Sequence, residues 1–173
     1  NSTEGKPIVS TPAAQSVNDG ETATFDVIAS DGQPPIYTYQ WQQSTNNGSS
    51  YSNMIGKNSR ILSLTATPDM NGYYYRCAVS NDAGTTYSSG ALLTVFYPMA
   101  LNPGYPEDKT INNGEKATLS ISFSDEGSPA QHTYQWYKND SVISNATSSS
   151  YTTPTLYTED SGNQYYCIVK HTK

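Results

Sequence analysis

Apolar and polar residues alternate along two short stretches of this chain, and each stretch follows a turn. Asp19-Gly20 precedes the first alternating run and Asn113-Gly114 precedes the second. Successive side chains of a β-strand point to opposite faces, so a period of two predicts a strand with one face in a core and one in water. The predicted inward positions are Ala23, Phe25, Val27 and Ala29 in the first stretch, and Ala117, Leu119, Ile121 and Phe123 in the second.

The two stretches belong to an internal repeat. The word TYQW occurs at residues 38–41 and again at 133–136. Further along, NGYYYRC at residues 71–77 matches SGNQYYC at 161–167, with Gly, Tyr and Cys in the same relative places. Because the order of turns, alternating runs and aromatic motifs recurs, the sequence predicts two copies of one structural unit.

The repeat sets the expected domain organisation. A chain of 173 residues accommodates two small domains. Short alternating runs separated by turn residues, without a long helix-forming stretch, indicate an all-β protein. We therefore expect two β-domains, residues 1–96 and 97–173, with a short linker near Phe96-Tyr97-Pro98 that limits swing between them.

Strand parity assigns a direction to each side chain of the repeated word. With Trp41 and Tyr39 pointing into the core, Thr38 and Gln40 point out toward water, and the second copy repeats the pattern around Trp136. The TYQW motif is thus predicted to pack one face of its strand into the core and to expose the other face to water.

The order of these motifs resembles the immunoglobulin sandwich, in which a Trp on the third strand packs near a Cys on the sixth. The resemblance places Trp41 with Cys77 and Trp136 with Cys167. It implies two tandem immunoglobulin-like β-sandwiches. The short spacing from Trp to Cys favours sandwiches without the extra strands of variable domains.

The same resemblance assigns four more core residues. Tyr75 and Tyr165 precede the Cys by two positions, where the family has a tyrosine corner whose hydroxyl bonds to backbone. Val27 and Ile121 stand where antibody-type domains carry the second Cys. Neither domain is therefore expected to form the intersheet disulfide.

Several sequence motifs are similar to those of the immunoglobulin-like repeats of bacterial surface and secreted proteins. The motifs are Trp41-Gln42, the Asn46-Asn47-Gly48 hairpin and the corner running from Met70 to Cys77. This likeness implies an extracellular location on a bacterial surface, with neighbouring repeats of the same kind as partners.

The second copy stops early after its Cys. Eighteen residues lead from Cys77 to the end of the apolar run at 91–95, whereas six residues follow Cys167. The second domain is therefore expected to lack its last strand. Two explanations stay open: a boundary within a longer repeat array, or a strand supplied by another molecule, as in donor-strand complementation.

Composition and candidate chemistry narrow the function further. A net charge of −6 disfavours nucleic acid, whose binding needs clustered Lys and Arg. No apolar run is long enough for membrane insertion.

Two isolated cysteines make neither a disulfide framework nor a metal site. His132 is expected in the loop before the second TYQW and His171 near the terminus.

No catalytic or cofactor-binding motif is present in the sequence. The carboxylates of Asp125-Glu126 and Glu159-Asp160 are expected at turns. There they either bond their own backbone, which we favour, or contribute to a calcium site. We expect no catalytic residue, no cofactor and no enzymatic activity.

Tyrosine is abundant, with 15 residues. Several of these are left over after the core is assigned, and outward-facing rings can form an aromatic platform for a glycan. Scattered exposed tyrosines without a ligand are the alternative explanation. The platform candidates are Tyr51, Tyr74, Tyr137 and Tyr166, followed by Tyr105 and Tyr157.

Three functions are compatible with these features. The first is a non-catalytic spacer or adhesion stalk of a bacterial surface or secreted protein. The second is an adhesive module that binds a host protein or glycan through its loops or tyrosines. The third is an accessory domain of a secreted carbohydrate-active enzyme.

Overall fold

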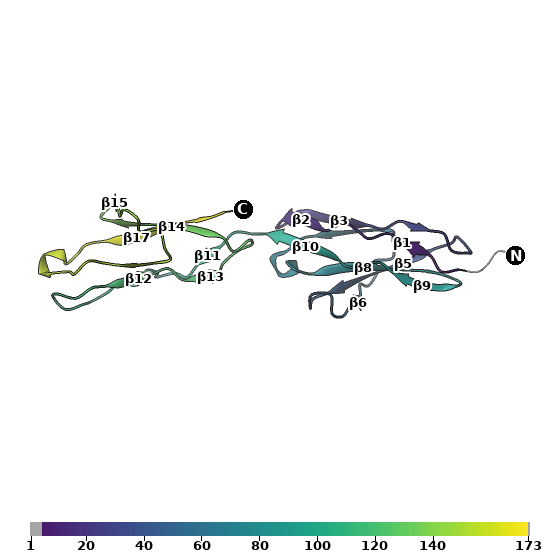
Figure 1. Ribbon diagram of the computed structural model, residues 1–173, viewed down its shortest axis with the longest axis horizontal. Coiled ribbons are helices and arrows are strands. Elements are labelled where there is room, and N and C mark those ends of the chain that lie inside the picture. The colour runs from purple at the N-terminus through teal and green to yellow at the C-terminus, as the bar shows by residue number, and fades with distance from the viewer. Residues whose placement is uncertain (1–4, 173) are drawn as a thin grey trace. The chain divides into compact units, whose positions relative to one another are not determined.

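The computed structural model describes residues 5–172 and contains almost only β-structure. Two single-turn 3₁₀ helices, Pro68–Met70 and Thr158–Asp160, are the helical elements of the described part. The chain divides into two compact units, residues 1–96 (unit 1) and 97–173 (unit 2). Both units consist of strands joined by turns and loops (Figure 1).

The larger sheet of unit 1 has the strand order β2-β10-β8-β5-β6, with β9 also paired to β8. All of its pairs are antiparallel except β2 with β10, which is parallel. Figure 1 shows β5 and β8, its longest strands, side by side. The strands are β2 (Gln15–Asn18), β5 (Thr38–Ser44), β6 (Ser52–Asn53), β8 (Tyr74–Asn81), β9 (Gly84–Tyr87) and β10 (Ala91–Phe96).

The second layer of unit 1 consists of two short antiparallel pairs. They are β3 (Thr22–Asp26) with β7 (Ile61–Thr65), and β1 (Ile8–Val9) with β4 (Ala29–Ser30). Ala23 and Phe25 of β3 are completely buried while their neighbours are exposed, as the alternation predicts. The Phe25 ring lies 6.4 Å from Trp41 and 5.1 Å from Tyr75, centroid to centroid, which joins the layers through aromatic packing.

Unit 2 repeats the arrangement with fewer strands. Its strands form three antiparallel sheets, and β17 pairs with β14 along one edge only. Within residues 97–172 no strand covers the other edge, so the prediction that the second domain lacks its last strand is confirmed. The sheets are β11 (Ala100–Leu101) with β13 (Phe123–Asp125), β12 (Thr118–Ser120) with β16 (Ser150–Thr152), and β15 (Ser141–Val142) with β14 (His132–Lys138) and β17 (Tyr165–His171).

The core of unit 2 is smaller than that of unit 1. Its buried members are Leu119, Trp136 and Ala146, and half-buried residues pack around them. The half-buried residues are Ile121, Ile143, Tyr151, Tyr165 and Cys167. An open edge beside β17 accounts for the incomplete burial.

Turns and hairpins lie where the sequence places them. Gly20 and Gly114 have φ values of +82° and +88°, which a side chain would strain, and both precede the alternating runs. Asn47 and Gly48 also have positive φ values and connect β5 to β6. The prediction that the sandwiches lack the extra strands of variable domains is therefore corrected. Each unit has one further strand at this edge, β6 in unit 1 and β15 in unit 2, and each is two residues long.

The absence of an intersheet disulfide is confirmed, since Cys77 and Cys167 are both free. Val27 is completely buried in unit 1, and Ile121 packs against the core of unit 2. The two immunoglobulin-like sandwiches are thus held by packing and hydrogen bonds without a covalent link between layers.

Candidate functional site

Each unit centres on one Trp and one Cys that face each other across adjacent strands. Trp41 of β5 pairs in register with Cys77 of β8, and Trp136 of β14 pairs with Cys167 of β17. Both indoles are completely buried. Their polar ends are satisfied identically, because Trp41 Nε1 donates to the Ser59 carbonyl and Trp136 Nε1 to the Ser148 carbonyl, both at 2.8 Å.

Tyr75 does not behave as a tyrosine corner. Its ring is completely buried, but its hydroxyl has no hydrogen-bond partner within the described residues. Burial, with smaller contributions from Tyr73 and Asp69, raises the pKa of Tyr75 to about 12. In unit 2 the Tyr165 ring packs 6.1 Å from Tyr151, with the Lys138 ammonium 6.0 Å from its centroid.

Both cysteine thiols have a raised pKa, which lowers their reactivity. Burial raises the pKa of Cys77 to about 11 and also raises the pKa of Cys167. The thiolate is the nucleophile and the metal ligand, so a raised pKa suppresses both reactions at neutral pH. Cys77 is buried and Cys167 is partly exposed, a difference that follows from the open edge of unit 2.

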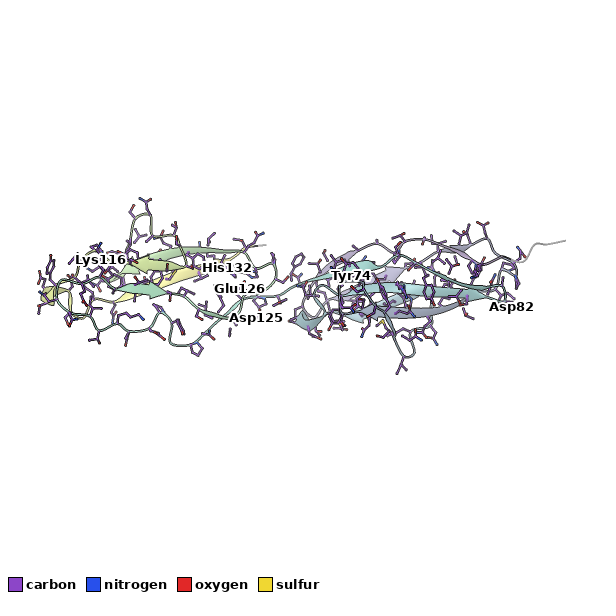
Figure 2. All side chains as sticks on the ribbon, turned by 60° about the horizontal axis from the view of Figure 1, so that its bottom comes forward. Tyr74, Asp82, Lys116, Asp125, Glu126 and His132 are labelled. Atoms are coloured by element: carbon purple, nitrogen blue, oxygen red, sulfur yellow. The ribbon has the colours of Figure 1, made fainter. Side chains whose placement is uncertain are left out.

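The two histidines lie in strands, so the prediction that His132 is in a loop is wrong. His132 begins β14 and faces His171 at the end of β17, with their ring centroids 5.5 Å apart. The His132 ring stacks on Phe123 at 4.5 Å, and its Nε2 bonds the Glu126 carbonyl at 2.8 Å. Figure 2 shows His132 with Asp125 and Glu126 at one end of unit 2. The imidazoles therefore serve strand pairing and loop attachment.

Asp160, in a single-turn helix, and Asp125, which ends strand β13 and so is not at a turn as expected, both bond to nearby backbone. Asp160 accepts the Tyr157 N–H at 3.0 Å, which together with Lys138 at 3.4 Å lowers the pKa of Asp160. Asp125 accepts the Gly127 N–H at 2.9 Å. Across residues 5–172 no group of three or more His, Cys, Asp or Glu side chains could hold a metal ion.

The outer face of the large sheet in unit 1 carries a cluster of a cation and aromatic rings. The Arg76 guanidinium lies 4.0 Å from the Tyr51 centroid and 4.4 Å from the Tyr87 centroid. Tyr74, labelled in Figure 2, lies next to Gly90, where a Cβ atom would come within 3.4 Å of its ring and 2.1 Å of the Tyr51 hydroxyl. Gly90 thus leaves room for both tyrosines. We call Tyr51, Tyr74, Arg76 and Tyr87 the Tyr–Arg cluster.

A chain of side-chain hydrogen bonds holds the cation in place. Arg76 Nε donates to Gln42 Oε1 at 2.8 Å, and Gln42 Nε2 donates to Asn53 Oδ1 at 2.7 Å. Arg76 and Tyr87 were not among the candidate residues predicted from the sequence. Strand parity could have found Arg76, since it shares the outward face of Tyr74 while Tyr75 and Cys77 point inward.

In unit 2 the corresponding outward positions hold two tyrosines. Tyr137 and Tyr166 face each other across β14 and β17, with ring centroids 4.9 Å apart and planes within 3°. Partial desolvation, together with the neighbouring Asp140 carboxylate, raises the pKa of Tyr166. The four platform candidates thus form one stacked pair in unit 2 and part of the Tyr–Arg cluster in unit 1. Tyr105 and Tyr157 are exposed.

Among residues 5–172 no helix has the length and apolar character needed to span a bilayer.

Two family models match the chain. A domain family of unknown function (DUF8696) matches residues 9–96, just over half of the chain. The immunoglobulin domain family matches residues 101–173.

Several solved structures share the fold at low sequence identity. The structure of DIP-gamma Ig1 and Ig2 has a TM-score of 0.69 at 16% identity, over 96% of this chain and 91% of that chain. Sidekick-1 immunoglobulin domains 1–5 give a TM-score of 0.66 at 17% identity, over 97% of this chain and 35% of that chain. Dpr2 Ig1-Ig2 in complex with DIP-Theta Ig1-Ig3 gives 0.60 at 18% identity, over 96% and 61%.

The chain thus spans about a third of the matched Sidekick-1 chain and less than two thirds of the matched chain in the Dpr2 complex. At these identities the likeness concerns the fold. Taken with the paired Trp and Cys residues and the two sandwiches, the family matches show that this chain is a tandem of immunoglobulin-like domains and belongs, through residues 9–96, to the DUF8696 domain family.

Proposed function

We propose that this chain is a non-catalytic extracellular segment that acts as a spacer or adhesion stalk of a bacterial surface or secreted protein. Residues 1–96 and 97–173 are its two proposed domains. The observation that carries the proposal is that groups capable of chemistry are engaged in structural contacts. The histidines bond backbone carbonyls, Asp125 and Asp160 accept turn N–H groups, and burial keeps the thiols protonated.

The extracellular location is supported by the kinship with immunoglobulin domains and by the acidic composition. The bacterial source rests on the motif resemblance of the corner that runs from Met70 to Cys77. Neighbouring immunoglobulin-like domains are the proposed partners. The Dpr2 structure, a complex between immunoglobulin domains of two proteins, supports partners of this type.

A binding survey tests the spacer function. The purified protein, immobilised at one end, is presented to a broad glycan array and to a panel of extracellular proteins. We expect no saturable binding, because a spacer needs no ligand. Saturable binding to one component would contradict the spacer and support an adhesive module.

The adhesive alternative is favoured by one specific observation, the Tyr–Arg cluster. Tyr and Arg are enriched at the centres of binding interfaces, and Tyr87 is 53% exposed beside the Arg76 cation. If a ligand is found, Arg76→Ala should weaken its binding at least about tenfold, as loss of a hot-spot residue does. The control is Tyr157→Ala, which removes from unit 2 a tyrosine about as exposed as Tyr87 of the cluster. This substitution should leave the binding unchanged.

The third alternative, an accessory domain of a secreted carbohydrate-active enzyme, depends on the gene. A flanking hydrolase domain in the complete reading frame would support it, whereas a surface-sorting signal would support the stalk.

A further inference from the structure

The outward faces of β14 and β17 carry two tyrosines that lie directly opposite each other. Tyr137 pairs in register with Tyr166, and their ring centroids are 4.9 Å apart with planes within 3°. Parallel rings at this distance are offset-stacked, which brings ring carbons of the two phenols into contact. Both side chains are half-buried, so the pair is partly accessible to solvent and to small reagents.

The equivalent place in unit 1 holds a different pair. Counted from the Trp and the Cys of each copy, the counterparts of Tyr137 and Tyr166 are Gln42 and Arg76, which also pair in register. There Arg76 Nε donates to Gln42 Oε1 at 2.8 Å, so a hydrogen bond joins the two strands. Unit 2 instead places two oxidisable rings in contact.

Side-chain hydrogen bonds hold this end of β14 and β17 together. Asn139 Nδ2 donates to Asn163 Oδ1 at 2.8 Å, and the Gln164 N–H donates to Asn139 Oδ1 at 2.8 Å. Two groups that are held close together react with each other much faster than the same groups free in solution. The stacked pair is therefore placed to react within the molecule.

A proton acceptor lies beside one of the rings. Partial desolvation and the neighbouring Asp140 carboxylate raise the pKa of Tyr166, so this phenol is protonated at neutral pH. Oxidation of a protonated phenol to a phenoxyl radical releases a proton, and the Asp140 carboxylate is placed to accept it.

Another pair of tyrosine rings in unit 2 is less suited to such a reaction. The Tyr151 and Tyr165 rings pack against the core, 6.1 Å apart and tilted by 32°. Their greater separation and their tilt keep the reacting ring carbons apart, in contrast to the stacked pair.

We propose that Tyr137 and Tyr166 form an oxidative cross-linking site. A one-electron oxidant, namely hydrogen peroxide activated by a haem peroxidase, joins the two rings as dityrosine. The site goes beyond the proposed spacer function, because it gives unit 2 a covalent bond between β14 and β17 while its cysteine stays free.

The reaction is an oxidation of two phenols by one peroxide. Each phenol gives one electron to the oxidant and one proton to a base, which leaves two phenoxyl radicals. The radicals combine through a carbon–carbon bond between the ring positions ortho to the oxygens. The hydrogen on each of these carbons then moves as a proton to the phenolic oxygen and restores both hydroxyl groups. Hydrogen peroxide takes up the two electrons and two protons and becomes two water molecules.

The test treats the intact 173-residue protein, at low concentration, with a haem peroxidase and hydrogen peroxide. Dityrosine fluorescence follows the reaction, and intact mass with peptide mapping locates the new bond. We expect a monomer that is lighter by two hydrogen atoms, in which the peptide of Tyr137 is joined to the peptide of Tyr166.

Variants that keep the rings identify the reacting phenols. Tyr137→Phe and Tyr166→Phe cannot form the phenoxyl radical at that position, so each should lower the yield of the intramolecular bond at least about tenfold. The matched control is Tyr165→Phe, which removes the next phenol along β17 on the opposite face and should leave the yield unchanged. Asp140→Asn removes the proton acceptor and should slow the reaction at least about tenfold.

The cross-linked monomer should also be more stable than the untreated protein. A covalent bond between residues 137 and 166 closes a loop in the unfolded chain and lowers its entropy, as a disulfide does. In calorimetry the melting temperature of unit 2 should rise by about 10 °C relative to Tyr166→Phe protein treated in the same way.

A parent protein that forms no intramolecular bond, while free tyrosine in the same solution couples, would overturn the proposal. Bonds that persist in both Phe variants, or that join only separate molecules, would overturn it as well. An unchanged rate in Asp140→Asn would overturn the role given to its carboxylate, and an unchanged melting temperature would overturn the stabilising role of the bond.

Discussion

The largest buried side chains of each sandwich include aromatic rings with a polar atom, and each such atom needs a hydrogen-bond partner. Both indole N–H groups donate to a loop carbonyl at 2.8 Å, so neither Trp carries an unsatisfied donor. Tyr75 differs, since its buried hydroxyl has no partner in the described residues. A buried polar group without a hydrogen bond lowers stability.

Replacing Tyr75 with Phe should therefore stabilise unit 1. We expect the free energy of unfolding of unit 1 to rise by about 1 kcal/mol, because the substitution removes an unsatisfied hydroxyl and keeps the ring. Urea denaturation followed by Trp fluorescence measures the change, and Tyr87→Phe at an exposed position is the control. A loss of stability would indicate that the hydroxyl bonds backbone, as a tyrosine corner requires.

The buried thiol of Cys77 predicts a loss of stability at high pH. Well below pH 9 the thiol is protonated in both folded and unfolded chains, and its full contribution is present. Above pH 9 the unfolded chain ionises first, so the free energy of unfolding falls until the folded pKa of about 11. A shift of this size corresponds to about 2–3 kcal/mol.

Denaturation of unit 1 measured from pH 8 to pH 11 checks this dependence. The Cys77→Ala variant, although less stable at pH 8, should show a flatter profile between pH 9 and pH 11 than the parent protein. An equal slope in the variant would mean that another group causes the alkaline loss.

At the scale of elements, the repeated word TYQW includes a clamp between strand and loop. Gln135 Nε2 donates to the Ile143 carbonyl at 2.8 Å and to the Trp136 carbonyl at 3.0 Å. Gln40 Nε2 makes the equivalent bonds to the Met54 and Trp41 carbonyls, both at 2.8 Å. Gln40 is therefore part-buried and bonded to backbone instead of being surrounded by water, and the equal spacing between Gln and Trp in the two copies has a structural reason.

Removing the clamp should weaken the unit that contains it. We expect Gln135→Ala to lower the free energy of unfolding of unit 2 by about 1–2 kcal/mol, because two part-buried hydrogen bonds between strand and loop are lost. The Trp136 and Ile143 carbonyls keep the N–H groups of Ile143 and Ala146 as donors. Thr133→Ala, on the same face of β14 and exposed, should change it by less than about 0.5 kcal/mol. Equal effects of the two substitutions in chemical denaturation would argue against the clamp.

At the scale of the whole molecule, the two units differ in how much they bury. Of the largest fully buried side chains in the described part, unit 2 contributes Trp136 and Thr153, and the others belong to unit 1. Burial of apolar side chains is the main favourable contribution to folding. Unit 2 should therefore be the less stable of the two.

Calorimetry of the intact chain should accordingly show two transitions, with unit 2 melting first. A protein of residues 1–96 alone should reproduce the upper transition, because unit 1 encloses a core of its own. One cooperative transition for the intact chain, absent from the shorter protein, would show that the units stabilise each other.

The sequence by itself determined the all-β class, the two copies, the buried Trp residues and the turns at Gly20 and Gly114. These are properties of local alternation and of backbone conformation, which neighbouring residues set.

Only the tertiary structure decided which polar atoms have partners. Some of these contacts join segments that are apart in the sequence: Gln135 with the Ile143 carbonyl, His132 with His171, and Arg76 with Tyr51 and Tyr87. The unbonded hydroxyl of Tyr75 depends on which side chains surround it. Alternation gives the face on which a side chain lies, but not which atoms it meets there, because those come from other strands brought together by packing.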